Sequence, residues 1–288
     1  MEPDRLKSEE ISVCIDDNRF ISLINSALSE DGLMAQILQY CQQSEANFRT
    51  SWNWLESRHN NCPLAENAFL IVVSELSKWV SYIHGFHGCR ITSDSTYCSN
   101  GICPLTPEWI EAEIIKWTGK LPSSGSEADA LLKRYLHSYS GKICAVKSLS
   151  LHQQHGGYGH SLGSETLRNI LQRHAPDALA SYLKTGEPSI VEFRIPISQL
   201  SPMAWENFVS DLLRIWLYSN FNYTRPSDPR WGGIILDHAV LPSWLIRRYS
   251  CDDNGKLTSK VYPYEPASSA LPTAQTSSPS SSRKVSYE

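Results

Sequence analysis

The chain has 288 residues, of which 41% are hydrophobic and 19% are charged, and its formal net charge is -4. This balance excludes a fully disordered chain, which would have too few apolar residues to bury. No strongly basic block is present, and this argues against nucleic acid as a partner, because phosphate binding needs clustered Lys and Arg.

The N-terminal sequence lacks the basic start and apolar run of a secretory signal. The most apolar stretch, 68–73, is far shorter than the roughly 20 residues that a membrane span needs. We therefore expect no membrane association. Eight cysteines without a signal favour reduced thiols, so a cytoplasmic location is expected.

Helical spacing dominates the N-terminal third of the chain. Residues 1–15 are polar and are expected to be loose. Apolar residues then recur every three or four positions over 20–28, and Asp31 suits the N-cap of a second helix. A third helix is expected over 64–83. Three helices joined by short turns predict an antiparallel bundle, which we place at 16–87.

Residues 84–105 break this pattern and indicate a Cys- and Gly-rich loop. Because the bundle is placed at 16–87, the loop as a separate region is placed at 88–105. Five soft metal ligands fall in this stretch: His84, His87, Cys89, Cys98 and Cys103. Four such ligands make a structural zinc site, although no Cys-x-x-Cys pair is present. The alternative is a junction loop with reduced thiols.

Residues 106–263 mix helical and strand periods and predict an α/β region. Thr106 followed by Pro107 is a helix start, and Ser126 caps a further helix. Strands are expected at 142–151, 189–197, 231–236 and 239–246, and helices at 164–172 and 201–217.

The last segment, 264–288, consists mainly of Ser, Pro, Thr and Ala and predicts a disordered tail. The expected fold class is therefore α+β. An N-terminal helical bundle would precede a mixed α/β half with a small sheet, and the tail would follow.

A Gly- and His-rich segment, LHQQHGGYGHSLGSE at 151–165, lies between a predicted strand and a predicted helix. A strand, a glycine-rich loop and a helix N-terminus in series favour a phosphate site, and His155 or His160 could act as acid or base. The expected anion ligands are Gly156, Gly157, Gly159 and Ser164. The spacing matches neither the P-loop nor the dinucleotide fingerprint, so a plain surface loop is the alternative.

Four later residues could serve the same site. Asp237 could orient one of the loop histidines, or Asp237 and His238 could belong to a turn. Arg225 and Arg230 suit phosphate binding, the alternative being an exposed polar loop.

The C-terminal half resembles ADP-ribosyltransferase-type folds, in which a serine-bearing strand, a later alternating strand and a final strand surround a nicotinamide-nucleotide cleft. The late strand here carries Asp237-His238 and no Glu-x-Glu pair, so no residue role is transferred from that family.

The expected function is an intracellular enzyme acting on a phosphate-bearing or nucleotide ligand, a NAD-dependent transferase being one form of it. NAD and zinc are the candidate cofactors. One alternative is a protein-interaction module that holds a partner helix between the N-terminal helices. A structural zinc protein is the other.

Overall fold

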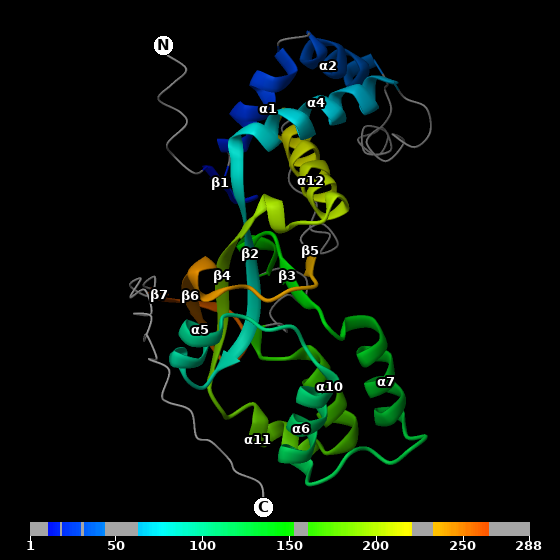
Figure 1. The fold of residues 1–288 in the computed structure, drawn as a ribbon, viewed down its shortest axis with the longest axis vertical. Coiled ribbons are helices and arrows are strands. Elements are labelled where there is room, and N and C mark those ends of the chain that lie inside the picture. The colour runs from blue at the N-terminus through cyan, green and yellow to red at the C-terminus, as the bar shows by residue number, and fades with distance from the viewer. Residues whose placement is uncertain are drawn as a thin grey trace, which may run out of the picture.

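The computed structural model describes residues 11–17, 19–29, 32–43, 63–152, 161–220 and 233–264 (Figure 1). A seven-stranded sheet lies at the centre of this part of the chain, in the order β5-β3-β2-β4-β6-β7, and β1 also pairs with β2. All neighbours are antiparallel except β1 and β2, which are parallel. The strands are β1 Ile11–Val13, β2 Val80–Ile91, β3 Ile143–Val146, β4 Glu187–Pro196, β5 Gly233–Leu236, β6 Leu245–Cys251 and β7 Leu257–Pro263.

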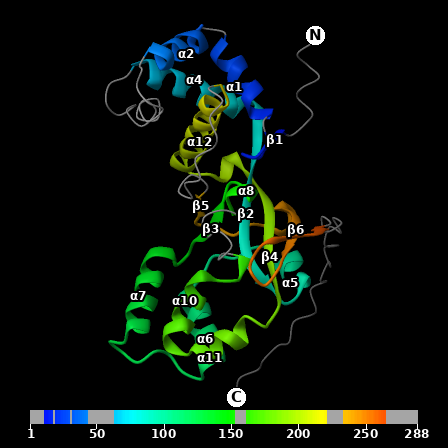
Figure 2. The ribbon, with the colours of Figure 1, turned by 180° about the vertical axis from the view of Figure 1, so that it is seen from behind.

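Helices gather at both ends of the sheet (Figures 1 and 2). One group contains α1 Arg19–Ser29, α2 Leu33–Gln43, α4 Pro63–Trp79 and α12 Pro202–Asn220. The other contains α6 Pro107–Thr118, α7 Glu127–Tyr139, α10 Glu165–His174 and α11 Pro176–Tyr182. The shorter helices α5 Asp94–Asn100 and α8 Leu149–His152 lie beside the sheet, and two 3-10 turns occupy Ile197–Gln199 and Pro242–Trp244. These observations confirm the α+β class.

The first helical group shares one core with the sheet. Phe20 of α1 and Trp216 of α12 are fully buried in the same cluster as Phe193 of β4. Trp216 also donates a hydrogen bond from Nε1 to the Asn25 side chain of α1, at 2.7 Å. Because a helix from the C-terminal half completes this core, a separate N-terminal bundle at 16–87 is not confirmed.

The second helical group has its own smaller core and follows the predicted capping. Ile110 and Ile170 are fully buried within it. The Thr106 side chain accepts from the backbone N–H of Trp109, and Ser126 does the same for Asp129. Within the described part of the chain, no helix is both long enough and apolar enough to cross a membrane.

The expectation of one long loop over 84–105 was wrong, because this segment contains the second half of β2, which ends at Ile91, and the helix α5. The helix expected over 64–83 ends at Trp79, and β2 follows it directly. Ten residue pairs join β2 to β4, and such a ladder outweighs the turn tendency of glycine and histidine. Gly85 suits this strand, because a Cβ there would lie 2.7 Å from the buried Phe193 ring.

Other expectations also changed. The strand expected at 142–151 ends at Val146, and the short helix α8 leads into the Gly- and His-rich segment. Residues 11–13 form β1 and are not loose. The strand expected at 239–246 is a single bridge from Val240 to Ile102, then a 3-10 turn, and β6 begins only at Leu245. The β6–β7 hairpin was not expected. Of the tail at 264–288, only Tyr264 lies among the described residues.

Candidate active site

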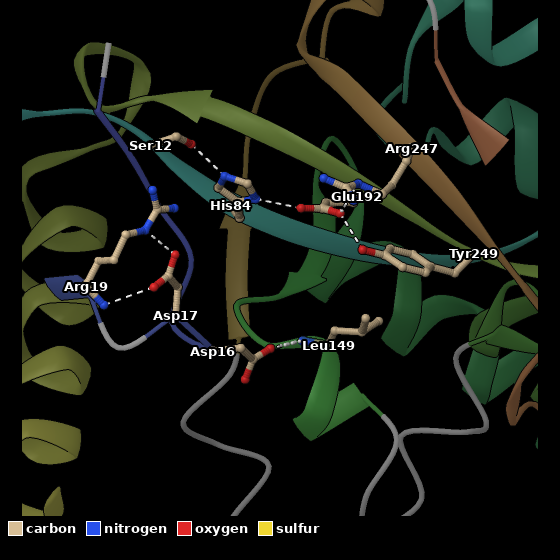
Figure 3. A network of polar contacts seen from close by, with 9 residues as sticks. All are labelled: Ser12, Asp16, Asp17, Arg19, His84, Leu149, Glu192, Arg247 and Tyr249. Carbon is tan, nitrogen blue, oxygen red and sulfur yellow. Dashed lines mark hydrogen bonds and ion pairs between the residues drawn. The ribbon is translucent and has the colours of Figure 1, made fainter. Parts of the chain in front are cut away.

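A chain of hydrogen bonds joins Ser12, His84 and Glu192 across one face of the sheet (Figure 3). The Ser12 Oγ lies 2.6 Å from Nε2 of His84, and Nδ1 of His84 lies 2.7 Å from Oε1 of Glu192. Ser12 is half-buried, whereas the side chains of His84 and Glu192 are 14% and 5% exposed. Three polar groups from β1, β2 and β4 are thus held in series.

Strand register explains why these residues meet. Paired residues of neighbouring strands point to the same side of a sheet. His84 is opposite Arg194 and Phe86 is opposite Glu192, so His84 and Glu192 are diagonal neighbours. We call this side, which carries His84, Phe86 and Glu192, the polar face. Ser12 reaches the polar face because β1 pairs with the start of β2.

Glu192 is held at its second oxygen as well. The Tyr249 hydroxyl donates to Oε2 at 2.6 Å, and Nε of Arg247 lies 3.0 Å from the same oxygen. Burial by itself raises the pKa of Glu192, but the hydrogen bonds from His84 and Tyr249 outweigh it, so its pKa lies below the usual value. Burial and the neighbouring Glu192 raise the pKa of Tyr249.

An ionised carboxylate only accepts hydrogen bonds, and this determines the direction of the chain. In the neutral imidazole, Nδ1 therefore carries the proton and donates it to Glu192. Nε2 then accepts from the Ser12 hydroxyl. A base that accepts from a serine and is oriented by a carboxylate is the arrangement used for nucleophilic catalysis by serine.

The turn after β1 is fixed by Asp16. Its carboxylate accepts from the Ser148 hydroxyl at 2.6 Å, from the Leu149 N–H at 2.7 Å and from the Ser150 hydroxyl at 2.8 Å. Asp17 is paired with Arg19 at the start of α1 (Figure 3). Both contacts anchor the chain immediately after Ser12.

Cys14 lies next to this site but is a poor nucleophile. Burial raises the pKa of the Cys14 thiol to about 11, although a hydrogen bond from the backbone of Asp16 opposes this effect, and the negative charge of Glu192 adds a smaller increase. With this pKa the thiol stays protonated at neutral pH. It is unreactive there, because the thiolate is the reactive form of cysteine. Ser12 is therefore the nucleophile that this cluster favours.

Most of the predicted phosphate site lies outside the described residues: His155, His160, Gly156, Gly157, Gly159, Arg225 and Arg230. Ser164 is described and caps α10, where its hydroxyl accepts from the N–H of Leu167. The phosphate site stays a prediction.

The structure does not bring the five predicted metal ligands together. His84 binds Ser12 and Glu192, whereas His87 binds the backbone carbonyl of Cys144. Cys89 is buried, and Cys98 and Cys103 are exposed. Over the described ranges, no three His, Cys, Asp or Glu side chains converge as a metal site. Alternation along β2 separates His84 and His87, because positions three apart on a strand face opposite sides.

Asp237 and His238 contact each other in the turn after β5. Nδ1 of His238 lies 3.0 Å from Oδ1 of Asp237, whose side chain is 92% exposed. This hydrogen bond lowers the pKa of Asp237. The arrangement agrees with the turn interpretation, and orientation of a loop histidine by Asp237 stays a prediction.

Comparison with protein-family models, curated proteins and solved structures gave no match. The polar network is therefore the basis for the functional argument.

Ser12 and Glu192 are not among the site residues that were predicted from the sequence. A lone carboxylate in the apolar strand SIVEFRIPI was a usable signal, because a buried acid needs partners. Ser12 carried no such signal, since its partner His84 is 72 residues away in the chain.

Proposed function

We propose that the protein is a hydrolase that cleaves acyl esters through Ser12, His84 and Glu192. The observation that carries the proposal is the hydrogen-bond chain from Ser12 Oγ through both ring nitrogens of His84 to Glu192. Support also comes from Tyr249 and Arg247, which hold the carboxylate that orients the imidazole.

In the proposed reaction, Ser12 Oγ attacks the carbonyl carbon of the ester while its proton passes to Nε2 of His84. The tetrahedral intermediate collapses, the bond to the leaving alcohol breaks, and that alcohol takes the proton from His84. Water then attacks the acyl-serine and gives its proton to His84. The carboxylic acid leaves, and Ser12 recovers its proton.

The first experiment is labelling of the full chain with a fluorophosphonate probe, followed by intact-mass analysis. Ser12 Oγ would displace fluoride and form one stable phosphonyl adduct, located at Ser12 by peptide mapping. We expect no adduct in Ser12→Ala and a strongly slowed reaction in His84→Ala. Ser29→Ala is the matched control, because Ser29 is exposed on α1 and its hydroxyl donates to the backbone carbonyl of Asn25.

Ester hydrolysis provides the second measurement. Ser12→Ala should lower kcat/KM by about a thousandfold or more, with a melting temperature close to that of the wild type. Ser29→Ala should keep full activity. An unlabelled wild type, or an adduct that persists in Ser12→Ala, would overturn the proposal.

A further inference from the structure

Two side chains of β6 contact Oε2 of Glu192, whereas His84 contacts Oε1 (Figure 3). The Tyr249 hydroxyl donates to Oε2 at 2.6 Å, and Nε of Arg247 lies 3.0 Å from the same atom. One carboxylate is thus shared by the imidazole, a neutral donor and a cation.

Strand pairing brings both side chains of β6 to the carboxylate. Arg247 is directly opposite Glu192 in the β4–β6 ladder. Tyr249 is opposite Ile190, so it is a diagonal neighbour of Glu192 on the polar face. The register shifts immediately after the Arg247 pair, between Glu192 and Phe193. A bulge of this kind bends the strand and re-aims the side chains next to it, and bulges are common beside active sites.

The two contacts differ in how solvent and salt affect them. Tyr249 is half-buried, and its raised pKa keeps the hydroxyl protonated, so it donates to Glu192 over the whole neutral range. The Arg247 side chain is 45% exposed, so dissolved ions can screen its charge. The Tyr249 hydroxyl carries no net charge for salt to screen.

Sharing the carboxylate changes its effect on the imidazole. An ionised carboxylate favours a positive charge on a neighbouring imidazole, and a second cation on the same carboxylate disfavours it. Arg247 therefore helps to keep His84 neutral, which is the form that can accept the proton of Ser12. Tyr249 holds Oε2 in place, so that Oε1 stays aligned with Nδ1 of His84.

We propose, resting on the proposed hydrolase function, that Tyr249 and Arg247 are positioning residues that act on Ser12 through Glu192 and His84. Tyr249 fixes the orientation of the carboxylate, and its loss lowers kcat. Arg247 balances the charge of the carboxylate, and its presence extends activity toward lower pH. The site therefore takes its working pH range from β6, a strand that contributes none of the residues in the hydrogen-bond chain.

The other ionisable side chains of this region lie on β1, in the turn after it, at the start of α1, on β2 and on β4. They are Cys14, Asp16, Asp17, Arg19, Tyr82 and Arg194. Asp17 interacts with the charge of His84 and is paired with Arg19. Arg194 stacks on the Tyr82 ring. All of them are retained in the variants below, so a change in the pH profile can be assigned to the two contacts from β6.

The test measures the hydrolysis of p-nitrophenyl acetate from about pH 5 to about pH 9. In Tyr249→Phe, kcat should fall by about tenfold or more, with KM within about twofold of the wild-type value. In Arg247→Gln, the pH at which kcat/KM reaches half its maximum should rise by about half a unit or more. Arg247→Lys keeps the charge and should restore the wild-type profile. Tyr139→Phe and Arg134→Gln are the controls, because both residues are exposed on α7.

Salt separates the two roles. Raising NaCl from about 0.05 M to about 0.5 M should shift the wild-type profile in the same direction as Arg247→Gln, and should leave the profile of that variant almost unchanged. The ratio of kcat between Tyr249→Phe and the wild type at the optimum pH should not respond to salt.

A further measurement needs no substrate and separates the two proposals. NMR titration of the His84 ring should show the same shift in Arg247→Gln, and melting temperatures check that each variant is folded. If the wild type neither hydrolyses the ester nor reacts with the fluorophosphonate, the hydrolase function fails, whatever the titration shows. If the wild type is active but Tyr249→Phe keeps its kcat, or Arg247→Gln moves neither the profile nor the titration, the hydrolase function stands and the role of β6 is overturned.

Discussion

At the scale of single residues, Glu192 has one role in stability and another in the proposed chemistry. Its side chain is only 5% exposed, and it contacts His84, Tyr249 and Arg247. A buried carboxylate is costly unless it is paired and hydrogen-bonded, so these three partners are the condition for its presence in an apolar strand. They also lower its pKa against the effect of burial.

Glu192→Gln should change how stability depends on pH. Since the folded-state pKa of Glu192 is below its value of about 4.3 in an unfolded chain, the unfolded state binds the proton first as the pH falls. The contribution of ionised Glu192 to the free energy of unfolding is therefore complete above about pH 5, and it is lost as the pH falls through the folded-state pKa. Urea unfolding at pH 7 to 3 should show a shallower loss of stability for Glu192→Gln than for the wild type.

At pH 7 the same variant should be less stable by about 1–3 kcal/mol, because Arg247 and Tyr249 lose an ionised partner. Glu108→Gln is the control, since Glu108 is exposed on α6 and its removal should leave the pH profile unchanged. Parallel profiles for the wild type and Glu192→Gln would contradict the prediction.

The predicted phosphate site has a residue-scale test of its own. If the segment around His155 and His160 binds nucleotides, a ligand at 100 times its Kd should stabilise the fold by about 2.7 kcal/mol. A thermal-shift screen with ATP, NAD and inorganic phosphate measures this, and His155→Ala or His160→Ala should abolish the shift without changing the melting temperature of the free protein. The absence of a shift with every ligand would reject the site.

At the scale of elements, the end of α5 depends on one glycine. Gly101 has φ 69 and ψ -148, a backbone conformation that is close to glycine-only. A Cβ there would lie 1.9 Å from the carbonyl oxygen of Val240, which accepts a hydrogen bond from the N–H of Ile102. This close approach joins α5 to the segment before β6.

Gly101→Ala should therefore destabilise the protein by about 3 kcal/mol or more. Gly119→Ala is a matched comparison, because Gly119 also has a positive φ, of 76, but a Cβ added there would have no atom within 4 Å. Gly119→Ala should lower the stability by only about 1–2 kcal/mol, because the left-handed backbone conformation is the one source of strain there. Equal effects in chemical denaturation would show that the contact with Val240 does not matter.

At the scale of the whole molecule, α12 connects distant parts of the chain. It packs with α1 and α4 in the core that also contains the buried face of β4. A polar bond between Trp216 and Asn25 adds to this contact, although the two residues are 191 positions apart. The N-terminal helices therefore depend on a partner from the C-terminal half of the sequence.

A fragment of residues 1–100 should consequently fail to fold on its own. Without α12 it would expose Phe20, Ile24 and Leu76, all of which are buried in the whole chain. We expect no cooperative thermal transition and poor solubility, whereas the full chain should unfold cooperatively. A sharp transition in the fragment would contradict this and would favour the interaction-module alternative.

Local signals in the sequence determined much of the secondary structure. The capped helices at Thr106 and Ser126, the alternating strand that became β4 and the long helix from Pro202 all depend on short-range patterns, and the structure contains them. β2 could not be predicted in this way. Its histidines and glycines are turn-forming by local preference, and only pairing with β4 stabilises the extended form.

The candidate site was decided by tertiary structure. Ser12, His84 and Glu192 come from three strands, and His84 and Glu192 are 108 residues apart in the chain. Neither their contact nor the stacking of Arg194 beside them follows from any local pattern. A hydrogen bond between distant residues depends on strand order and register, and these are set by the whole buried core.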